Sequence, residues 1–227
     1  MIKNQVEILV IGSINMDLVM SVERVPMAGE TVLGQGYSYI PGGKGANQAV
    51  AAARLNGKVT FCGRVGDDSN GETLLRNLKD NGVDTSFIIK DSRNRTGLAA
   101  IPVESNGDNR IMVFPGANSC IAREDVDKAL ERSYDAVMMQ LEIPLDIVYY
   151  AFEKASEKGI PVILDTGPAV KIDLPRLKGI HVITPNESEA AALTGIQVDS
   201  TDDAVRAAKI LADKAEASYV VIKMGDK

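Results

Sequence analysis

The chain has 227 residues, of which 45% are hydrophobic and 25% are charged. These proportions are typical of a globular protein and exclude wholesale disorder or a fibrous repeat, and the length suits one large α/β domain or two small ones. The formal net charge of −6 gives no general attraction to nucleic acid or anionic membranes, so we expect neither as a partner. No apolar run approaches the roughly 20 residues of a membrane span, and no signal-peptide pattern precedes the first strand, so we expect a cytoplasmic protein.

Apolar runs rich in β-branched residues alternate with helical patterns along the chain. Strands are predicted at 7–14, 58–66, 135–141, 161–165, 181–184 and 219–224. Helices are predicted at 46–55, 71–79, 124–132 and 146–158, and from a cap at Ser200 to residue 214, with Asp203 as the capping-box acid. The alternation predicts an α/β fold, with an open and mostly parallel sheet and helices on both faces.

Two regions lack this alternation. Residues 19–40 hold glycines, Pro26 and short alternating runs without a helical stripe. Residues 98–114 read as two strands around the turn sequence Asn-Gly-Asp-Asn at 106–109. We interpret both as insertions that form a small β-sheet lid over the carboxyl edge of the main sheet. Residues 1–227 would then form one α/β core with a lid.

The side chains available for chemistry narrow the possible functions. There is one histidine, His181, and the two cysteines, Cys62 and Cys120, have neither metal-ligand nor disulfide spacing. Chemistry built on a Ser-His pair or on several histidines around a metal is therefore nearly excluded.

Carboxylates lie at or just after the ends of four predicted strands. They are Asp17, Glu142, Asp165 and Glu189. Ligands of open α/β sheets bind outside the carboxyl ends of the strands, so these acids are expected to converge. A divalent cation, or a polyhydroxy ligand that donates hydrogen bonds, would offset their repulsion. A single acid at such a place is more often a cap or turn former, and the recurrence is what favours a site.

Residues 41–48 read Pro-Gly-Gly-Lys-Gly-Ala-Asn-Gln and open directly into a predicted helix. Glycines allow the backbone to approach a ligand closely, and a helix N-terminus attracts anions. Lys44 and Asn47 lie about one helical turn apart and can face the same ligand. The segment is not a Walker A loop, because Gly45 follows Lys44, and no G-x-G-x-x-G follows a strand. A flexible turn with a helix cap is the alternative interpretation.

Five segments carry a family resemblance. They are Gly12-Ser13-Ile14-Asn15-Met16-Asp17, Gly42-Gly43-Lys44-Gly45-Ala46-Asn47-Gln48-Ala49, Val65-Gly66-Asp67-Asp68 with Gly71-Glu72, Met139-Gln140-Leu141-Glu142, and Thr184-Pro185-Asn186-Glu187-Ser188-Glu189-Ala190. In this order they resemble the ribokinase-like carbohydrate kinases, a family that includes fructokinases and adenosine kinase. The resemblance runs from Ile8 to the last residue.

By this resemblance, the sugar-binding residues are Asn15, Met16, Asp17, Gly43, Lys44, Gly45, Ala46, Asn47 and Glu142. Asn15 and Asp17 would hold sugar hydroxyls from the end of the first strand, and Glu142 would bind the sugar from another strand. Carboxylates suit this task, since each can accept two O–H donors. The implied reaction is ATP-dependent phosphorylation of D-ribose to ribose 5-phosphate.

The resemblance also implies nucleotide and metal sites. The ATP-binding residues are Asn186, at the phosphates, and Lys223, Met224, Gly225, Asp226 and Lys227 after the last strand. Glu189 would organise Mg²⁺ through its water molecules, with Asp165 near the same metal. Lys223 departs from the pattern, because the family leads us to expect a small hydroxyl residue there.

Family members continue beyond this point into a Gly-Ala-Gly-Asp type motif, which supplies the catalytic base and an anion hole for the transferring phosphoryl group. This sequence ends at Lys227, so we assign no catalytic residue within it, and the family's loop for a monovalent cation, K⁺, is absent as well. We therefore expect a C-terminally truncated kinase that is itself inactive, because positioning and electrostatics carry phosphoryl transfer.

Two alternatives stay open. The parent enzyme could be another sugar or nucleoside kinase of the same family, or the chain could be a non-catalytic sugar-binding fragment. The lid raises a separate expectation. Its amphipathic strands are too few to be stable alone, which predicts that they pair with a second subunit in a twofold homodimer.

Overall fold

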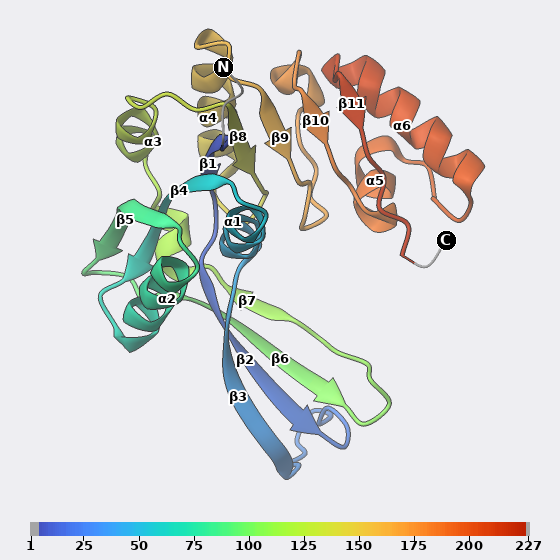
Figure 1. The fold of residues 1–227 in the computed structure, drawn as a ribbon. Helices are drawn as coiled ribbons and strands as arrows, with labels where there is room; N and C mark the ends of the chain where they lie inside the picture. The colour runs from blue at the N-terminus through green and yellow to red at the C-terminus, as the bar shows by residue number, and fades with distance from the viewer. Residues whose placement is uncertain (1–4, 226–227) are drawn as a thin grey trace.

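The computed structural model describes residues 5–225 (Figure 1). The first half contains β1 (Glu7–Ile11), β2 (Asn15–Val22), β3 (Gly34–Gly42), α1 (Lys44–Arg54), β4 (Lys58–Gly66), α2 (Ser69–Asp80), β5 (Asp84–Asp91), β6 (Gly97–Glu104), β7 (Met112–Phe114) and the 3-10 helix η1 (Gly116–Cys120). The second half contains α3 (Arg123–Ala129), β8 (Ala136–Met139), α4 (Leu145–Glu157), β9 (Val162–Leu164), the 3-10 helix η2 (Leu174–Leu177), β10 (Val182–Ile183), α5 (Glu187–Thr194), α6 (Thr201–Ala215) and β11 (Tyr219–Val220).

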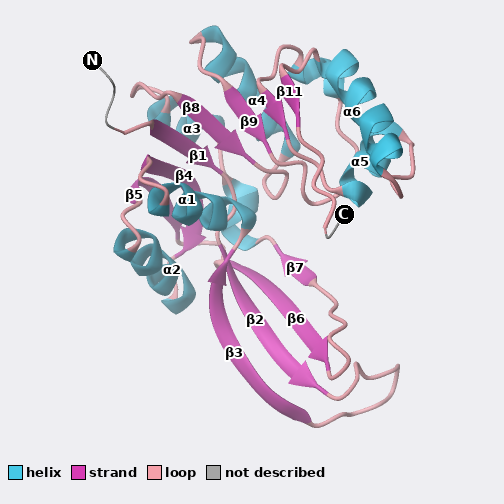
Figure 2. Ribbon diagram, turned by 45° about the vertical axis from the view of Figure 1, so that its right-hand side comes forward, coloured by secondary structure: helices cyan, strands magenta, loops and turns pink. Residues whose placement is uncertain are grey.

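The main sheet has seven strands in the order β11-β10-β9-β8-β1-β4-β5, and all neighbouring pairs are parallel. Helices lie on both of its faces (Figure 2). The predicted α/β class is therefore confirmed. Because the strands all point the same way, their carboxyl ends meet along one edge, where a ligand site is expected.

Strand β1 shows how the sheet is buried on both faces. Leu9 and Ile11 are fully buried in the larger apolar cluster, which includes side chains of α3, α4 and α6. Val10, between them, is fully buried in a second cluster with α1 and α2. A strand covered on both faces needs apolar residues at successive positions, which explains the continuous apolar run in this part of the sequence.

The ends of several elements differ from the sequence-based expectation. The predicted strand 7–14 stops at Ile11, and after a short turn a separate strand, β2, begins at Asn15. Strand β5 and helix α5 were not expected at all. β5 is an edge strand with half-exposed side chains, so it lacks a continuous apolar run. Within residues 5–225, no helix is long and apolar enough to cross a membrane.

The cap of helix α6 is partly as predicted. The Ser200 hydroxyl accepts a hydrogen bond from the Asp203 backbone N–H at 3.2 Å, which confirms the N-cap. The Asp203 carboxylate accepts from the Ser200 hydroxyl at 2.7 Å instead of from the backbone N–H of Ser200. The reciprocal bond of a capping box is therefore replaced by a side-chain contact.

A second, smaller sheet extends from the main domain (Figure 2). Its strand order is β3-β2-β6-β7, with β2 and β6 parallel and the outer pairs antiparallel. It contains the two segments expected to form a lid, and the predicted turn at 106–109 is present, where Glu104 N–H donates to Asp108 C=O at 2.8 Å. Its strands begin earlier than expected, at Asn15 and Gly97.

Candidate active site

The N-terminus of helix α1 is held against the end of β1 by Ser13 and Glu142. The backbone N–H groups of Lys44 and Gly45 donate to the Glu142 carboxylate at 3.0 Å and to the Ser13 hydroxyl at 3.3 Å. The Ser13 hydroxyl in turn donates to Glu142 at 2.5 Å, and Ala46 N–H donates to the Ser13 carbonyl. The protein's own Glu142 therefore occupies the anion-attracting end of this helix.

The glycines before α1 are needed for close packing. Gly43, the N-cap residue, has φ +91°, and a Cβ there would lie 2.7 Å from the backbone nitrogen of Asn15. A Cβ at Gly42 would overlap the Asp17 carboxylate. These contacts bring the start of β2 and the start of α1 together, so Asn15 and Asp17 lie beside the Lys44 end of the helix.

Asp17 is half-buried on β2, and its pKa is raised above the ordinary value. Burial is the larger cause, and the nearby charge of Glu142 is the second. Two carboxylates that repel each other in a partly buried place favour a ligand that donates hydrogen bonds to both. This pair is the clearest electrostatic feature of the sugar-binding residues expected from the sequence.

A second group of side chains lies at the ends of β9 and β10. The Lys223 ammonium donates to Asp165 at 2.7 Å and lies 4.0 Å from the Glu189 carboxylate. Glu189 is only 4% exposed and accepts from the backbone N–H of Asn186 at 2.9 Å, while the Asn186 side chain accepts from Glu189 N–H at 2.8 Å. This reciprocal capping box fixes both residues at the start of α5.

Lys44 lies between the two groups. A Cβ at Gly167 would lie 2.6 Å from the Lys44 ammonium and 2.7 Å from the second carboxylate oxygen of Glu189. The structure thus brings the four predicted acids into two pairs, with Asp17 of the small sheet near Glu142, and Asp165 near Glu189 after strands of the main sheet. Lys44 lies between the two pairs, and Lys223 lies beside Asp165 and Glu189. Both positive charges reduce the repulsion among the carboxylates.

Some expected residues lie elsewhere. Met16 is 2% exposed and packs in the apolar cluster under α1 and α2, so its side chain does not face the site. Asn47 is exposed and lines a hollow between α1 and α2, with Arg54 and Asn77. Of the residues expected to bind ATP, Met224 and Gly225 follow Lys223 beside α5, and Asp226 and Lys227 lie outside the described residues.

Two buried amides near the site were not expected from the sequence. Asn118, in η1, donates to the Asn15 side-chain oxygen at 2.7 Å. Gln140 donates to the Gln48 side chain at 2.6 Å, and its own oxygen is packed between Gly12 and Gly45 without a partner in the described chain. Gln140 belongs to one of the five segments described above. Asn118 belongs to none of them, and only the folded structure shows its contact with Asn15.

Comparison with known proteins identifies the family. Residues 5–227 match the family described as pfkB family carbohydrate kinase. The chain belongs to this family. The kinase is 42% identical to a ribokinase of Haemophilus influenzae over 220 residues, which are 96% of this chain and 72% of that protein. It is 38% identical to a deoxyribokinase of Salmonella typhi, over 97% of this chain and 73% of the relative.

Solved structures agree with this assignment. The kinase superposes on an Arabidopsis thaliana ribokinase, solved with ribose and ATP, with a TM-score of 0.88 and 30% identity. The match covers 98% of this chain and 73% of the other. A ribokinase of Thermotoga maritima gives a TM-score of 0.86 at 33% identity, with 98% and 73% covered. The fold and the family are therefore those that the five sequence segments indicated.

The kinase has a donor set that fits Mg²⁺ bound together with a nucleotide. Within residues 5–225, no group of three or more His, Cys, Asp or Glu side chains could enclose a metal ion. Mg²⁺, however, is usually held by one or two carboxylates and by substrate phosphates, with water completing the octahedron. Glu189 and Asp165 supply hard oxygen ligands of this kind, and the second oxygen of Glu189 faces Gly167 and not the α5 backbone.

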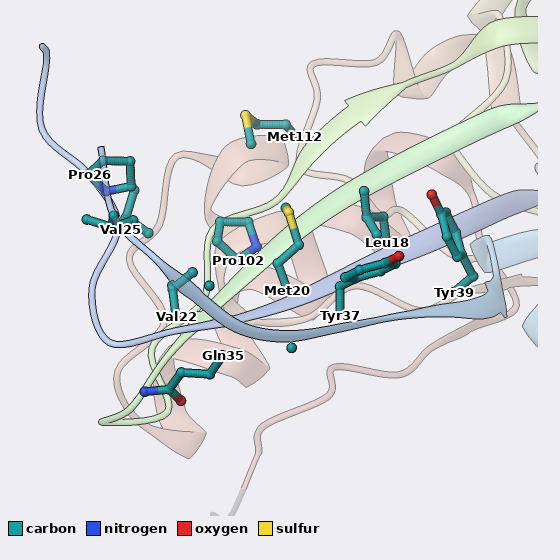
Figure 3. Close-up of a pocket in the computed structure, with 13 residues that line it drawn as sticks. Leu18, Met20, Val22, Val25, Pro26, Gln35, Tyr37, Tyr39, Pro102 and Met112 are labelled. Carbon is teal, nitrogen blue, oxygen red and sulfur yellow. The ribbon is translucent and has the colours of Figure 1, made fainter. Parts of the chain in front are cut away.

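A larger cavity lies away from these residues. It has a volume of about 860 Å³ and lies on the small sheet, where Leu18, Met20, Tyr37, Pro102 and Met112 line it (Figure 3). Its lining is apolar, which does not suit a polyhydroxy sugar or a phosphate group. We therefore place the candidate active site at the strand ends and return to this cavity below.

Proposed function

We propose that this kinase transfers the γ-phosphoryl group of ATP to the terminal hydroxyl of D-ribose and produces ribose 5-phosphate. The observation that carries the proposal is the meeting of Asn15, Asp17 and Glu142 beside the start of α1, in a chain 42% identical to a ribokinase. Hydroxyl groups are the donors that two adjacent carboxylates require. The small sheet would close over the sugar and exclude water from the transfer.

On the sugar side, Asp17 and Glu142 would accept hydrogen bonds from sugar hydroxyls, and Asn15 would supply a further contact from β2. Gly43 allows the chain to pass close to the backbone of Asn15, which keeps the start of α1 beside Asn15 and Asp17. Lys44 reaches from this group toward Glu189, which suits a cation that attracts the transferring phosphoryl group.

On the nucleotide side, Asn186 and the segment beginning at Lys223 would contact the ATP phosphates. Mg²⁺, held by Glu189 with Asp165 nearby, would neutralise phosphate charge when bound. The Lys223 ammonium already lies beside both carboxylates, and it can turn to the phosphates when a divalent cation takes its place. Dependence on K⁺ and a cytoplasmic location stay predictions from the family resemblance and the composition.

The second candidate substrate is 2-deoxyribose, because a deoxyribokinase is 38% identical to this chain. Calorimetric titration with ribose, 2-deoxyribose, fructose and adenosine distinguishes the candidates. We expect ribose to bind most tightly. Tighter binding of 2-deoxyribose, or of fructose or adenosine, would assign the kinase to another substrate, and binding of none of them would contradict the proposed sugar site.

We also propose that the apolar face of the small sheet packs against a second copy of the chain. Leu18, Met20, Tyr37 and Met112 line one face, while Asp17 points to the opposite face because neighbouring residues of a strand alternate. Tyr37 is 74% exposed, which is unusual for a large side chain surrounded by other apolar groups. Covering this face would leave the Asp17 face available to sugar.

Light scattering coupled to size exclusion tests this assembly. We expect the mass of a dimer for the unchanged protein and that of a monomer for Met20→Asp with Tyr37→Lys, because charges in an apolar interface are costly to bury. Val205→Asp is the control, since it changes an exposed apolar residue on α6 (47% exposed), outside the small sheet. A monomeric mass for the unchanged protein would contradict the proposal.

A further inference from the structure

Asn118 is buried deep beside the sugar-binding residues, although no sugar or nucleotide contact is assigned to it. It lies in η1, just after the last strand of the small sheet, and is 1% exposed. Its side chain spans the turn between β1 and β2, 104 positions earlier in the sequence. Ile14 N–H donates to its oxygen at 2.9 Å, and its nitrogen donates to the Ile14 carbonyl at 3.1 Å and to the Asn15 side-chain oxygen at 2.7 Å.

The backbone of Ile14 determines how this amide is oriented. A backbone N–H can only donate and a carbonyl can only accept, so the Asn118 oxygen must face Ile14 N–H and the Asn118 nitrogen must face Ile14 C=O. That nitrogen also faces the side chain of Asn15. The Asn15 atom beside it must then be an acceptor, which is the amide oxygen.

The consequence is that Asn15 turns its NH₂ group away from Asn118. Within residues 5–225, the buried side-chain polar atoms without a partner are Tyr134 Oη and Gln140 Oε1. The Asn15 nitrogen is not among them and makes no hydrogen bond in this part of the chain, so this nitrogen keeps some exposed surface although the residue as a whole is only 3% exposed. Asn15 therefore presents a donor beside Asp17 and Glu142, which in their ionised forms only accept.

We propose that Asn118 is a positioning residue, which orients the Asn15 amide so that its NH₂ group donates to a sugar hydroxyl oxygen. This inference rests on the proposed function, because it takes Asn15 as a sugar contact. A sugar hydroxyl can donate to one group and accept from another. A site with one donor beside two carboxylates therefore binds polyhydroxy ligands more selectively than a site that has acceptors alone. The packing supports a fixed orientation, because a Cβ at Gly97 would overlap both the Asn15 oxygen and the Asn118 nitrogen.

A double-mutant cycle on sugar binding tests the proposal. Asn15→Ala, Asn118→Ala and the double variant are titrated by calorimetry with ribose, with each singly deoxygenated ribose and with ATP. We expect each single change to weaken ribose binding about tenfold, as one lost hydrogen bond would. The double variant should bind like Asn15→Ala alone, since Asn118 acts only through Asn15. ATP affinity should not change.

Two further variants separate orientation from stability. Asn118→Asp can still accept from Ile14 N–H but cannot donate to Asn15, so the Asn15 amide should reverse and ribose binding should again weaken about tenfold. Gly97→Ala should have the same effect by displacing the pair. Asn56→Asp adds the same charge at an exposed turn after α1 and should leave ribose affinity unchanged.

The deoxygenated sugars give the readout that a merely structural role would not produce. In the unchanged protein, the analogue that lacks the accepting hydroxyl should bind about tenfold more weakly than ribose. This difference should vanish in both Asn15→Ala and Asn118→Ala. Equal weakening for all sugars and for ATP in Asn118→Ala, or additive losses in the double variant, would overturn the positioning role. Unchanged ribose binding in Asn15→Ala would instead overturn the sugar contact itself, and the positioning role with it.

Discussion

Asp17→Asn is expected to weaken ribose binding roughly 10- to 150-fold while ATP affinity stays the same, because a charge-assisted hydrogen bond contributes about 1.5–3 kcal/mol. Asp17 lies at the start of the small sheet and beside Glu142, away from the Asn186 and Lys223 group. Calorimetric titration with ribose and with ATP measures both affinities. Asp67→Asn is the control, since Asp67 follows β4 of the main sheet and is paired with Lys90 at the surface.

The same variant has an opposite effect on stability. The pKa of Asp17 is raised in the folded protein, first by burial and second by Glu142. A raised carboxyl pKa means that the folded state disfavours the charged form, so this contribution to stability is fully present below the ordinary value of 3.8 and is lost as the pH rises through the folded value. Without sugar, Asp17→Asn should therefore melt at a higher temperature than the unchanged protein at pH 7.

The two effects are connected by the function. A group that is costly to keep charged in the empty site is the group that gains most when a sugar hydroxyl donates to it. Ribose binding should accordingly weaken when the pH falls through the raised pKa of Asp17, and the weakening should disappear in Asp17→Asn. An unchanged ribose affinity in this variant would remove Asp17 from the sugar site.

Glu142→Ala should have a larger effect, because it removes a sugar contact and the anchor of α1 together. Lys44 N–H and the Ser13 hydroxyl both donate to one oxygen of Glu142, and Ser13 is fully buried. Each donor left without a partner costs about 1–3 kcal/mol, so we expect a lower free energy of unfolding and ribose binding at least about 100-fold weaker. Chemical denaturation and calorimetry measure the two quantities.

Glu142→Gln distinguishes the two roles of this residue. The glutamine oxygen can accept from both Lys44 N–H and Ser13, so most of the stability should return, while sugar binding should stay weak because the charge is lost. Asp125→Ala is the control. Asp125 is also buried and caps a helix, α3, and it pairs with Arg64 at 2.7 Å. The Asp125→Ala change should lower the free energy of unfolding with no change in ribose affinity. Normal ribose binding in Glu142→Ala would contradict the assignment of Glu142 as a sugar contact.

Local sequence patterns were sufficient to predict the fold class and the carboxylates that follow the strands. Continuous apolar runs such as that of β1 require burial on both faces, and their alternation with helical stripes leaves a parallel sheet as the simple solution. Parallel strands place their carboxyl ends at one edge, so acids after strand ends, including Glu142 and Glu189, could be expected to lie near one another. The glycines before α1 were expected to let the backbone approach a ligand, whereas Gly43 makes its close approach to the backbone of Asn15.

Errors arose where a short turn separates two strands. The sequence gives no clear sign that β1 ends at Ile11 and that a new strand begins at Asn15, because only Gly12 and Ser13 stand between the apolar run and the next apolar residue, Ile14. Met16 was consequently treated as part of a polar segment. Once β2 is recognised, alternation along the strand places Asn15 and Asp17 on one face and Met16 on the other, where it packs into the core.

Contacts between distant parts of the chain were decided only by the tertiary structure. The sequence showed that a carboxylate follows β8, but not that Glu142 would bind the N-terminus of α1, and it gave Lys223 no partner although Asp165 holds its ammonium. Asn118 carried no signal at all, since its partners precede it by about a hundred positions. Local periodicity determines which face of each element is buried, whereas a hydrogen bond across the fold depends on which elements the topology brings together.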